Sequence, residues 1–319
     1  MHMSHLHLGE NLSKEIISSQ EIFQCNIGWK VERFTQKSAL VPSTDPFYFF
    51  DHIATKAILL GFSKNQRVLL QGLHGSGKST HIEQVAARLN WPCLRINLDG
   101  HITRADLLGR DVIRLTDGKP ITLFQEGLLP WAIQQPIALV LDEYDAARPE
   151  VLFVLQQLLE QEGHLTLIDE NKRITPHPDF RIFATANTLG MGDITGLYFG
   201  THPLNQGQLD RWNIVAKLSY MEREMEQLLV QAKNPDLDSE LVHDMVAFAD
   251  LTRIGFYAGD IPLPMSPRGV LTWANHTSLL RDVKEALTLC YINRFEEDIY
   301  PLLNAYYQKA FKETGENKA

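Results

Sequence analysis

The sequence predicts an α/β protein in which a parallel sheet is sandwiched by helices, followed by a C-terminal part made of helices alone. An apolar run at 68–70 leads into a glycine-rich loop at 72–80, and an amphipathic helix follows the loop. Three later apolar-rich runs at 93–98, 137–141 and 181–186 are expected to be buried strands, and the run at 137–141 contains no polar residue. Such runs are typical of parallel strands that are buried on both faces. Beyond residue 219 only helical periodicity remains.

Composition excludes several classes of protein. The chain has 319 residues, of which 44% are hydrophobic and 22% are charged, as in soluble globular proteins. Its formal net charge of −9 disfavours non-specific binding to nucleic acid or to an anionic membrane, because such binding needs a basic face. The three cysteines form no C-x-x-C pair, which argues against a zinc ribbon and suits a reducing compartment. No apolar run has the length of a membrane span and no secretory signal is evident, so we expect a cytoplasmic protein.

The loop at 72–80 contains the pattern G-x-x-x-x-G-K-[ST], which binds the phosphates of a nucleotide. Glycines allow backbone N–H groups to surround phosphate oxygens, and the start of the next helix adds the positive end of its dipole. We therefore expect Lys78 to contact the β and γ phosphates of ATP, and the Ser79 hydroxyl to ligate Mg²⁺. The residues expected to bind ATP are Gly72, His74, Gly75, Ser76, Gly77, Lys78, Ser79 and Thr80.

Two acidic residues, Asp142 and Glu143, follow the apolar run at 137–141. Because open α/β sheets bind ligands at the carboxyl ends of their strands, we expect both acids beside the phosphates. Asp142 is expected on the Mg²⁺ side of the site, and Glu143 is expected to be the base that activates a water. Asn187 ends the next buried strand and would hold that water if the two strands are neighbours. The structural alternatives are a helix-capping acid pair and an asparagine that only terminates a strand.

The remaining segments divide the chain into three parts. We expect an N-terminal extension at 1–45, a nucleotide-binding α/β core at 46–218 and a helical lid domain at 219–319. At the start of the core, Tyr48 and Phe50 either line an adenine pocket or belong to the hydrophobic core. We favour the core, because aromatic residues at this density are usually buried in packing.

Two pairs of short apolar runs predict β-hairpins inserted into the core. The first pair lies at 112–124 with an Asp-Gly turn at 117–118, and the second lies at 165–175. Helices are expected at 47–61 and 149–163, and each is expected to end at a glycine.

The order of these features resembles that of the AAA+ ATPases. It consists of the phosphate loop, a strand ending in Asp-Glu, a strand ending in Asn, an arginine after a glycine-rich loop, and a helical tail containing Ser-Pro-Arg. The two inserted hairpins are similar to those of the MoxR and chelatase branch. Longer strings are similar to the ATPase subunits of aerobic cobaltochelatase, and they lie at 74–93, 142–146, 183–188, 195–198 and 205–212.

This resemblance implies a homo-oligomeric ring, expected to be a hexamer, with ATP between adjacent subunits. Arg211 is then the arginine finger that reaches the γ-phosphate held by the next subunit, and Arg268 is the sensor arginine of its own subunit. Without the resemblance, each arginine would be interpreted as a surface ion-pair residue. The expected catalytic residues are thus Glu143, Asn187, Arg211 and Arg268, and the expected metal ligands are Ser79 and Asp142.

The resemblance also implies a function. The family couples ATP hydrolysis to the insertion of Co²⁺ into hydrogenobyrinic acid a,c-diamide during aerobic cobalamin biosynthesis. A large partner subunit binds the macrocycle, and an adhesion-domain subunit connects it to the ring. The implied mechanism is mechanical, with the hairpins passing motion to these partners.

Three alternatives remain open from the sequence. A MoxR-type remodelling ATPase could mature a different metalloenzyme or complex. A nucleic-acid-engaging ring is disfavoured by the acidic charge and by the absence of a basic, aromatic-interleaved tract. A non-catalytic nucleotide-switched scaffold is disfavoured because it would not need the water-activating Glu143.

Overall fold

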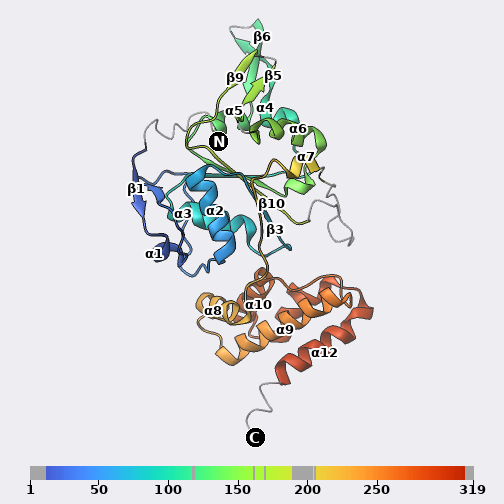
Figure 1. The fold of residues 1–319 in the computed structure, drawn as a ribbon. Helices are drawn as coiled ribbons and strands as arrows, with labels where there is room; N and C mark the ends of the chain where they lie inside the picture. Colours follow the sequence, from blue (N-terminus) through green and yellow to red (C-terminus); the bar gives the residue numbers. More distant parts are fainter. Residues whose placement is uncertain are drawn as a thin grey trace. The chain divides into compact units, whose positions relative to one another are not determined.

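The computed structural model describes residues 12–116, 119–160, 162–168, 170–188, 204 and 206–312 (Figure 1). By their contacts these residues form two compact units. The first unit contains the described residues of Met1–Thr44, Phe50–Gly72 and Lys78–Lys217. The second unit contains those of Asp45–Phe49, Leu73–Gly77 and Leu218–Ala319.

A five-stranded sheet forms the centre of the first unit, with the strand order β11-β3-β10-β7-β4. Every neighbouring pair in this sheet is parallel. The strands are β3 (Val68–Gln71), β4 (Cys93–Asn97), β7 (Ala138–Asp142), β10 (Arg181–Ala186) and β11 (Ile214–Lys217). All residues of β3, β7 and β10 are buried, which explains their apolar sequences and confirms the predicted parallel sheet.

Helices cover this sheet. Helix α2 contacts β3, β10 and β11, and α3 contacts β7 and β10. A hydrophobic cluster that includes Leu139 on β7, Ile133 and Leu155 joins the sheet to two further helices, α5 and α6. The helices of this unit besides the N-terminal α1 are α2 (His52–Lys64), α3 (Lys78–Arg88), α4 (Arg104–Leu108), α5 (Leu128–Ile133), α6 (Pro149–Leu158), α7 (Gln206–Leu209) and the short 3₁₀ helix η2 (Tyr144–Ala146).

Helix α2 differs from the sequence prediction at both ends. It begins at His52, because the Asp51 carboxylate accepts a hydrogen bond from the Ala54 backbone N–H at 2.7 Å and caps the helix. It also continues through Gly61, which was expected to end it. A Cβ atom at Gly61 would lie 2.6 Å from the Phe183 ring. Gly61 therefore allows close packing of the helix on the sheet and does not terminate the helix.

The helix that was expected to end at Gly163 ends earlier, at Leu158. A Cβ atom at Gly163 would lie 2.5 Å from the Leu158 backbone oxygen. A side chain at position 163 would collide with the last residue of α6, so the close approach of the chain to this helix end requires a glycine. Of the two aromatic residues assigned to the core, Phe50 packs edge-on against Phe23 and His81, at 5.2 and 5.5 Å between ring centroids.

Residues 12–44 are part of the first unit. They contain the antiparallel strands β1 (Lys14–Ile17) and β2 (Val31–Phe34) and the short helix α1 (Ser19–Phe23). The Phe34 ring lies 4.5 Å from that of Trp91, and the Phe34 backbone N–H donates to the Leu89 carbonyl at 3.0 Å.

Two antiparallel hairpins lie outside the central sheet, which confirms the predicted insertions. The first pairs β5 (Gly109–Thr116) with β6 (Lys119–Glu126) and projects beyond the sheet of its unit (Figure 1). The second pairs β8 (Leu165–Leu167) with β9 (Lys172–Ile174). The expected turn at 117–118 and the strings at 195–198 and at 205 lie outside the described residues.

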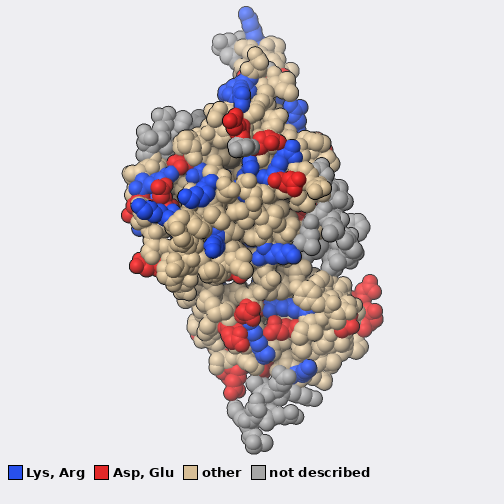
Figure 2. Space-filling view, viewed as in Figure 1, with Lys and Arg blue, Asp and Glu red and all other residues tan. Residues whose placement is uncertain are grey.

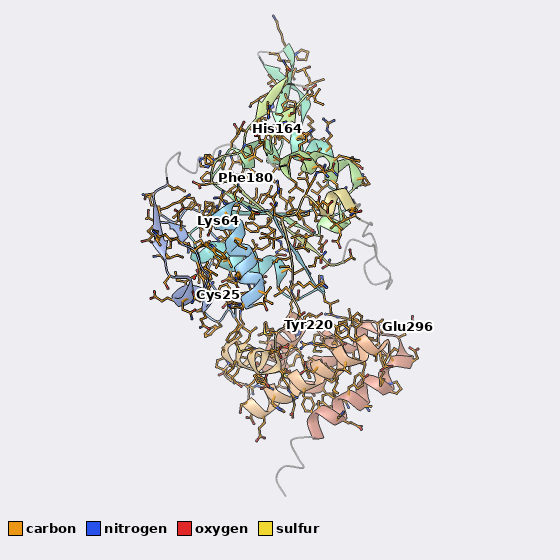
Figure 3. The ribbon with its side chains drawn as sticks, viewed as in Figure 1. Cys25, Lys64, His164, Phe180, Tyr220 and Glu296 are labelled. Atoms are coloured by element: carbon orange, nitrogen blue, oxygen red, sulfur yellow. The ribbon has the colours of Figure 1, made fainter. Side chains whose placement is uncertain are left out.

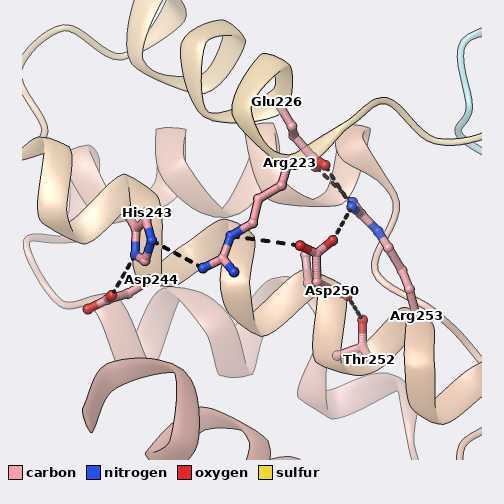
Figure 4. A network of polar contacts seen from close by, with 8 residues as sticks. Arg223, Glu226, His243, Asp244, Asp250, Thr252 and Arg253 are labelled. Carbon is pink, nitrogen blue, oxygen red and sulfur yellow. Dashed lines mark hydrogen bonds and ion pairs between the residues drawn. The ribbon is translucent and has the colours of Figure 1, made fainter. Parts of the chain in front are cut away.

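The C-terminal part of the second unit is helical, as predicted. Its buried core includes Trp273, Phe248 and Met245. Close to this core, the Arg253 guanidinium donates to both Glu226 carboxylate oxygens, at 2.7 and 2.8 Å (Figure 4). The helices are α8 (Arg223–Lys233), α9 (Ser239–Ala258), α10 (Pro267–Leu280), α11 (Val283–Cys290), α12 (Tyr300–Lys312) and the 3₁₀ helices η3 (Ile292–Arg294) and η4 (Glu297–Ile299). None of the helices in the described part of the chain combines the length and apolar character needed to cross a membrane.

Candidate nucleotide-binding site

The amino group of Lys78 lies at the end of the central sheet. Helix α3 begins at Lys78, and its Nζ donates to the Gly72 carbonyl at 2.8 Å and to Asn187 Oδ1 at 2.9 Å. Asn187 directly follows β10, the neighbour of both β3 and β7. The strand order therefore brings together the lysine and the asparagine that the sequence assigned to one site.

Asp142, the last residue of β7, is buried and receives hydrogen bonds on both carboxylate oxygens. Oδ1 accepts from the Ser79 and Thr185 hydroxyls, and Oδ2 accepts from the Arg95 guanidinium, with Nε at 2.8 Å. Burial alone would raise the pKa of Asp142, but these hydrogen bonds and the Arg95 charge together hold it below its usual value. The carboxylate is therefore kept ionised, as a metal ligand must be.

Glu143 directly follows Asp142 and has a left-handed backbone conformation, with φ 56° and ψ 45°. This conformation is uncommon for a residue with a side chain and is often found at functional sites. The backbone N–H of Glu143 donates to the Thr185 hydroxyl at 3.2 Å. Burial raises the pKa of Glu143, and the charges of Asp142 and Asp145 raise it further. Its carboxylate is thus more basic than that of an ordinary glutamate, which suits a general base.

Asp145 is fully buried and positions the end of β10. Its Oδ2 accepts hydrogen bonds from the backbone N–H groups of Asn187, at 3.0 Å, and Thr188, at 2.8 Å, and from the Thr188 hydroxyl at 2.8 Å. These bonds connect the turn after Glu143 to Asn187, so Asp145 fixes the relative positions of the expected base and the expected water-holding amide.

Sequence reasoning assigned no role to Thr185, Arg95 or Asp145. One signal was available, because each is a polar residue in or beside an otherwise apolar strand. The buried Thr185 and Asp145 side chains need hydrogen-bond partners and find them in the site, and the exposed Arg95 pairs there with Asp142.

The phosphate loop itself, at 73–77, has the backbone that its glycines predict. Gly75 and Gly77 have φ values of 77° and 88°, a region that favours glycine. The Ser76 hydroxyl is buried and has no hydrogen-bond partner among the described residues. A phosphate oxygen is a suitable acceptor for such a hydroxyl.

By contacts, 73–77 belong to the second unit. The Tyr220 hydroxyl, labelled in Figure 3, donates to the His74 carbonyl at 3.0 Å. A Cβ atom on Gly75 would lie 2.5 Å from the Ser266 hydroxyl, which caps α10. Arg268, the expected sensor arginine, lies exposed in the first turn of α10, two residues after Ser266.

Arg211 lies elsewhere in the first unit. Its Nε pairs with Glu160 at 2.8 Å, and its Nη1 donates to the Gly207 carbonyl. Neither partner belongs to the cluster around Asp142. Thr80 lies in the first turn of α3, directly after Ser79.

Residues 67–197 match the AAA domain family, dynein-related subfamily. The chain is 50% identical over 305 residues to the aerobic cobaltochelatase subunit CobS of Sinorhizobium sp, and the match covers 94% of this chain and 92% of that protein. A midasin of Dictyostelium discoideum is 33% identical over 167 residues, which are 52% of this chain and 3% of that protein. Among solved structures, the RuvB Holliday junction branch migration motor of Thermotoga maritima is similar, with 14% identity, coverage of 74% of this chain and 68% of that one, and a TM-score of 0.45.

Proposed function

The chain belongs to the family of the aerobic cobaltochelatase subunit CobS, and we propose that it is the ATP-hydrolysing motor subunit of a cobaltochelatase-type complex. In this role it drives the ATP-dependent insertion of Co²⁺ into hydrogenobyrinic acid a,c-diamide. The observation that carries the proposal is the cluster of Lys78, Asp142, Glu143 and Asn187 at one edge of the sheet. The 50% identity to CobS, which extends over 94% of this chain, supports the assignment to this chelatase.

The residues present fit a magnesium–nucleotide complex. The Ser79 hydroxyl and the Asp142 carboxylate supply oxygen donors, which Mg²⁺ prefers, and a hydrogen bond already joins them. When bound, Mg²⁺ neutralises negative charge on the phosphates. Lys78 and the backbone N–H groups of 73–77 would bind phosphate oxygens, and the Ser76 hydroxyl, which has no partner within the described part of the chain, would gain an acceptor.

Hydrolysis needs an oriented water and a base to accept its proton. Glu143 takes the part of the base, because its raised pKa makes the carboxylate a better proton acceptor than that of an ordinary glutamate. Asn187 holds the water, since Asp145 and Lys78 fix its backbone and its amide oxygen. Asp142 has the opposite task and remains an anion, because its pKa is lowered.

The site is completed by a neighbouring subunit in this proposal. Arg211 acts as an arginine finger in a hexameric ring, and Arg268 senses the phosphates within its own subunit. Support comes from the ion pair between Arg211 and Glu160, whose side chains are 30% and 55% exposed, because such a pair can exchange partners at low cost. Further proposed partners are a large macrocycle-binding subunit and an adhesion-domain subunit, in the cytoplasm.

A nucleic-acid substrate is not favoured. In the visible face of Figure 2, lysine and arginine are interspersed with aspartate and glutamate and form no continuous basic surface. With a net charge of −9, the chain offers little electrostatic attraction for a phosphate backbone. We expect no stimulation of ATP hydrolysis by DNA.

Reconstitution tests the proposed function. The chain is combined with the large subunit and the adhesion-domain subunit, and ATP-dependent Co²⁺ insertion is measured. We expect insertion with this chain and none with its Glu143→Gln variant, which lacks the base. ATP hydrolysis by the chain without Co²⁺ insertion in the full mixture would point to a MoxR-type remodelling ATPase with another client.

A further inference from the structure

Arg95 on β4 is an unexpected cation in the proposed magnesium site. Both its Nε and its Nη2 contact the same Asp142 oxygen, Oδ2, while Ser79 and Thr185 occupy Oδ1. The Asp142 side chain is 7% exposed and that of Arg95 is 43% exposed. The carboxylate is therefore fixed and buried, whereas the guanidinium reaches it from the solvent side.

A second carboxylate acts on the same guanidinium. Glu83, on α3, is half-buried and interacts electrostatically with both Arg95 and Asp142. Burial raises the pKa of Glu83, and the positive charge of Arg95 opposes that rise. The guanidinium is thus attracted by two carboxylates, and the contact that the structure shows is the one with Asp142.

Arg95 and a divalent cation cannot both approach Asp142 closely without repulsion, because the two positive charges would lie a few ångströms apart. Conversely, Asp142 without any cation would be a buried charge that lacks compensation, which is strongly unfavourable. A cation that is present before the metal and can leave satisfies both requirements.

We propose that Arg95 is a displaceable counter-cation of Asp142. It neutralises Asp142 before the Mg²⁺–nucleotide complex binds, and it shifts toward Glu83 when that complex binds. This inference rests on the proposed nucleotide site and names the residue that sets the Mg²⁺ requirement of that site. Arg95 is a positioning residue here, since it acts through Asp142 and Glu83.

The test measures Mg²⁺-dependent binding of a fluorescent, non-hydrolysable ATP analogue to the full chain, so that no turnover is needed. In Arg95→Gln we expect the Mg²⁺ concentration at half-maximal binding to fall by up to about 5-fold, the upper end of the effect of an ion pair with a solvent-exposed partner. Arg95→Lys keeps the positive charge but carries it on one nitrogen. Its Mg²⁺ concentration at half-maximal binding should lie between that of Arg95→Gln and that of the unmodified chain. Arg110→Gln removes an equal charge from the exposed hairpin strand β5 and should leave the midpoint unchanged.

If the inference is correct, Glu83→Gln shifts the Mg²⁺ midpoint in the direction opposite to that of Arg95→Gln. Without a second carboxylate, Arg95 stays on Asp142, and the Mg²⁺ midpoint should rise. Thermal unfolding in EDTA provides a readout without nucleotide, and there Arg95→Gln should be less stable than the unmodified chain and regain more stability when Mg²⁺ is added.

Two results would overturn the inference. An unchanged or higher Mg²⁺ midpoint in Arg95→Gln, with normal analogue binding by the unmodified chain, refutes the role of Arg95 and leaves the nucleotide site intact. If the unmodified chain binds the analogue with no dependence on Mg²⁺, the proposed site itself fails, and the inference fails with it.

Discussion

Two arginine–carboxylate pairs, one in each unit, show how similar chemistry can serve different purposes. In the second unit, Arg253 and Glu226 are 8% and 0% exposed, and both carboxylate oxygens accept from the guanidinium (Figure 4). The Arg253 Nε is also satisfied, because it donates to the Met265 carbonyl at 2.9 Å. In the first unit, the Arg95 side chain is 43% exposed and contacts only one oxygen of Asp142.

This difference separates a fixed pair from an exchangeable one. Removing Arg253 leaves the buried Glu226 carboxylate without this partner, and removing Glu226 leaves Arg253 paired with Asp250 alone, at 2.9 Å, so we class the pair as structural. Arg95 can move into solvent or toward Glu83, and Asp142 can then accept another cation. The pair between Arg211 and Glu160 is also exposed on both sides and belongs to the exchangeable class.

The largest expected effect tests that classification at Arg211. If Arg211 leaves Glu160 to act on a neighbour's ATP, then Arg211→Ala should reduce ATP turnover by about 10³- to 10⁵-fold, because an arginine finger stabilises the transition state to that extent. ATP binding should be retained, as measured by equilibrium dialysis. The matched control, Glu160→Gln, keeps the finger and should keep turnover. Near-normal ATP turnover in Arg211→Ala would show that Arg211 is only a surface ion-pair residue and not an arginine finger.

Glu143→Gln is expected to have the next largest effect. The amide keeps the size of the side chain but cannot accept a proton, so turnover should fall by about 10²- to 10⁴-fold. The variant should still bind ATP, since Lys78 and Ser79 are unchanged. Single-turnover hydrolysis with bound ATP checks this expectation, and a rate within a few-fold of the unmodified chain would remove Glu143 from the chemistry.

The fixed pair should affect stability and not chemistry. Arg253→Ala leaves Glu226 buried and unpaired, so we expect the free energy of unfolding of the second unit to fall by about 3–5 kcal/mol. Urea denaturation, followed by tryptophan fluorescence, to which Trp273 of that unit contributes, measures the loss. A double replacement by Arg253→Met and Glu226→Leu should cost less than the single change, because Glu226 is then not left as a buried, unpaired charge. Equal losses in both variants would contradict the classification as a buried ion pair.

The smallest expected effect is a pH dependence of turnover. The pKa of Glu143 is raised and that of Asp142 is lowered, so on acidification Glu143 gains its proton first. Turnover should therefore decline as the pH falls through the raised pKa of Glu143, while Asp142 is still ionised. The ATP turnover rate, measured as a function of pH, should show one decline on the acidic side. This decline should be absent from the low rate that remains in Glu143→Gln. An acidic limb that persists in the variant would assign the titration to another group.

Local sequence patterns were sufficient where local physics decides the structure. The run ending at Asp142 is apolar throughout because β7 is buried on both faces, and the glycines of 73–77 have the backbone angles that the phosphate loop needs. The hairpins and the C-terminal helices were also predicted, since turns and helical periodicity are local signals.

Other features depend on tertiary contacts that no local pattern contains. Gly61 was expected to end a helix, but the Phe183 ring, far away in the sequence, is what requires a glycine there. The short helix α5 was not predicted, because six residues are too few to show a period. The pairing of Arg95 with Asp142 depends on the strand order, which places β4 beside β7.

A mixing experiment tests most directly whether the ATP site is shared between subunits. Lys78→Ala should lack phosphate binding and Arg211→Ala should lack the finger, so each variant alone should be inactive as an ATPase. When differently tagged variants are assembled together, an intact Lys78 site in one subunit can receive Arg211 from its neighbour, and a measurable fraction of turnover should return. If the two variants co-assemble, as shown by tandem affinity purification, and the mixture stays inactive, Arg211 does not act across a subunit boundary and the shared-site account is wrong.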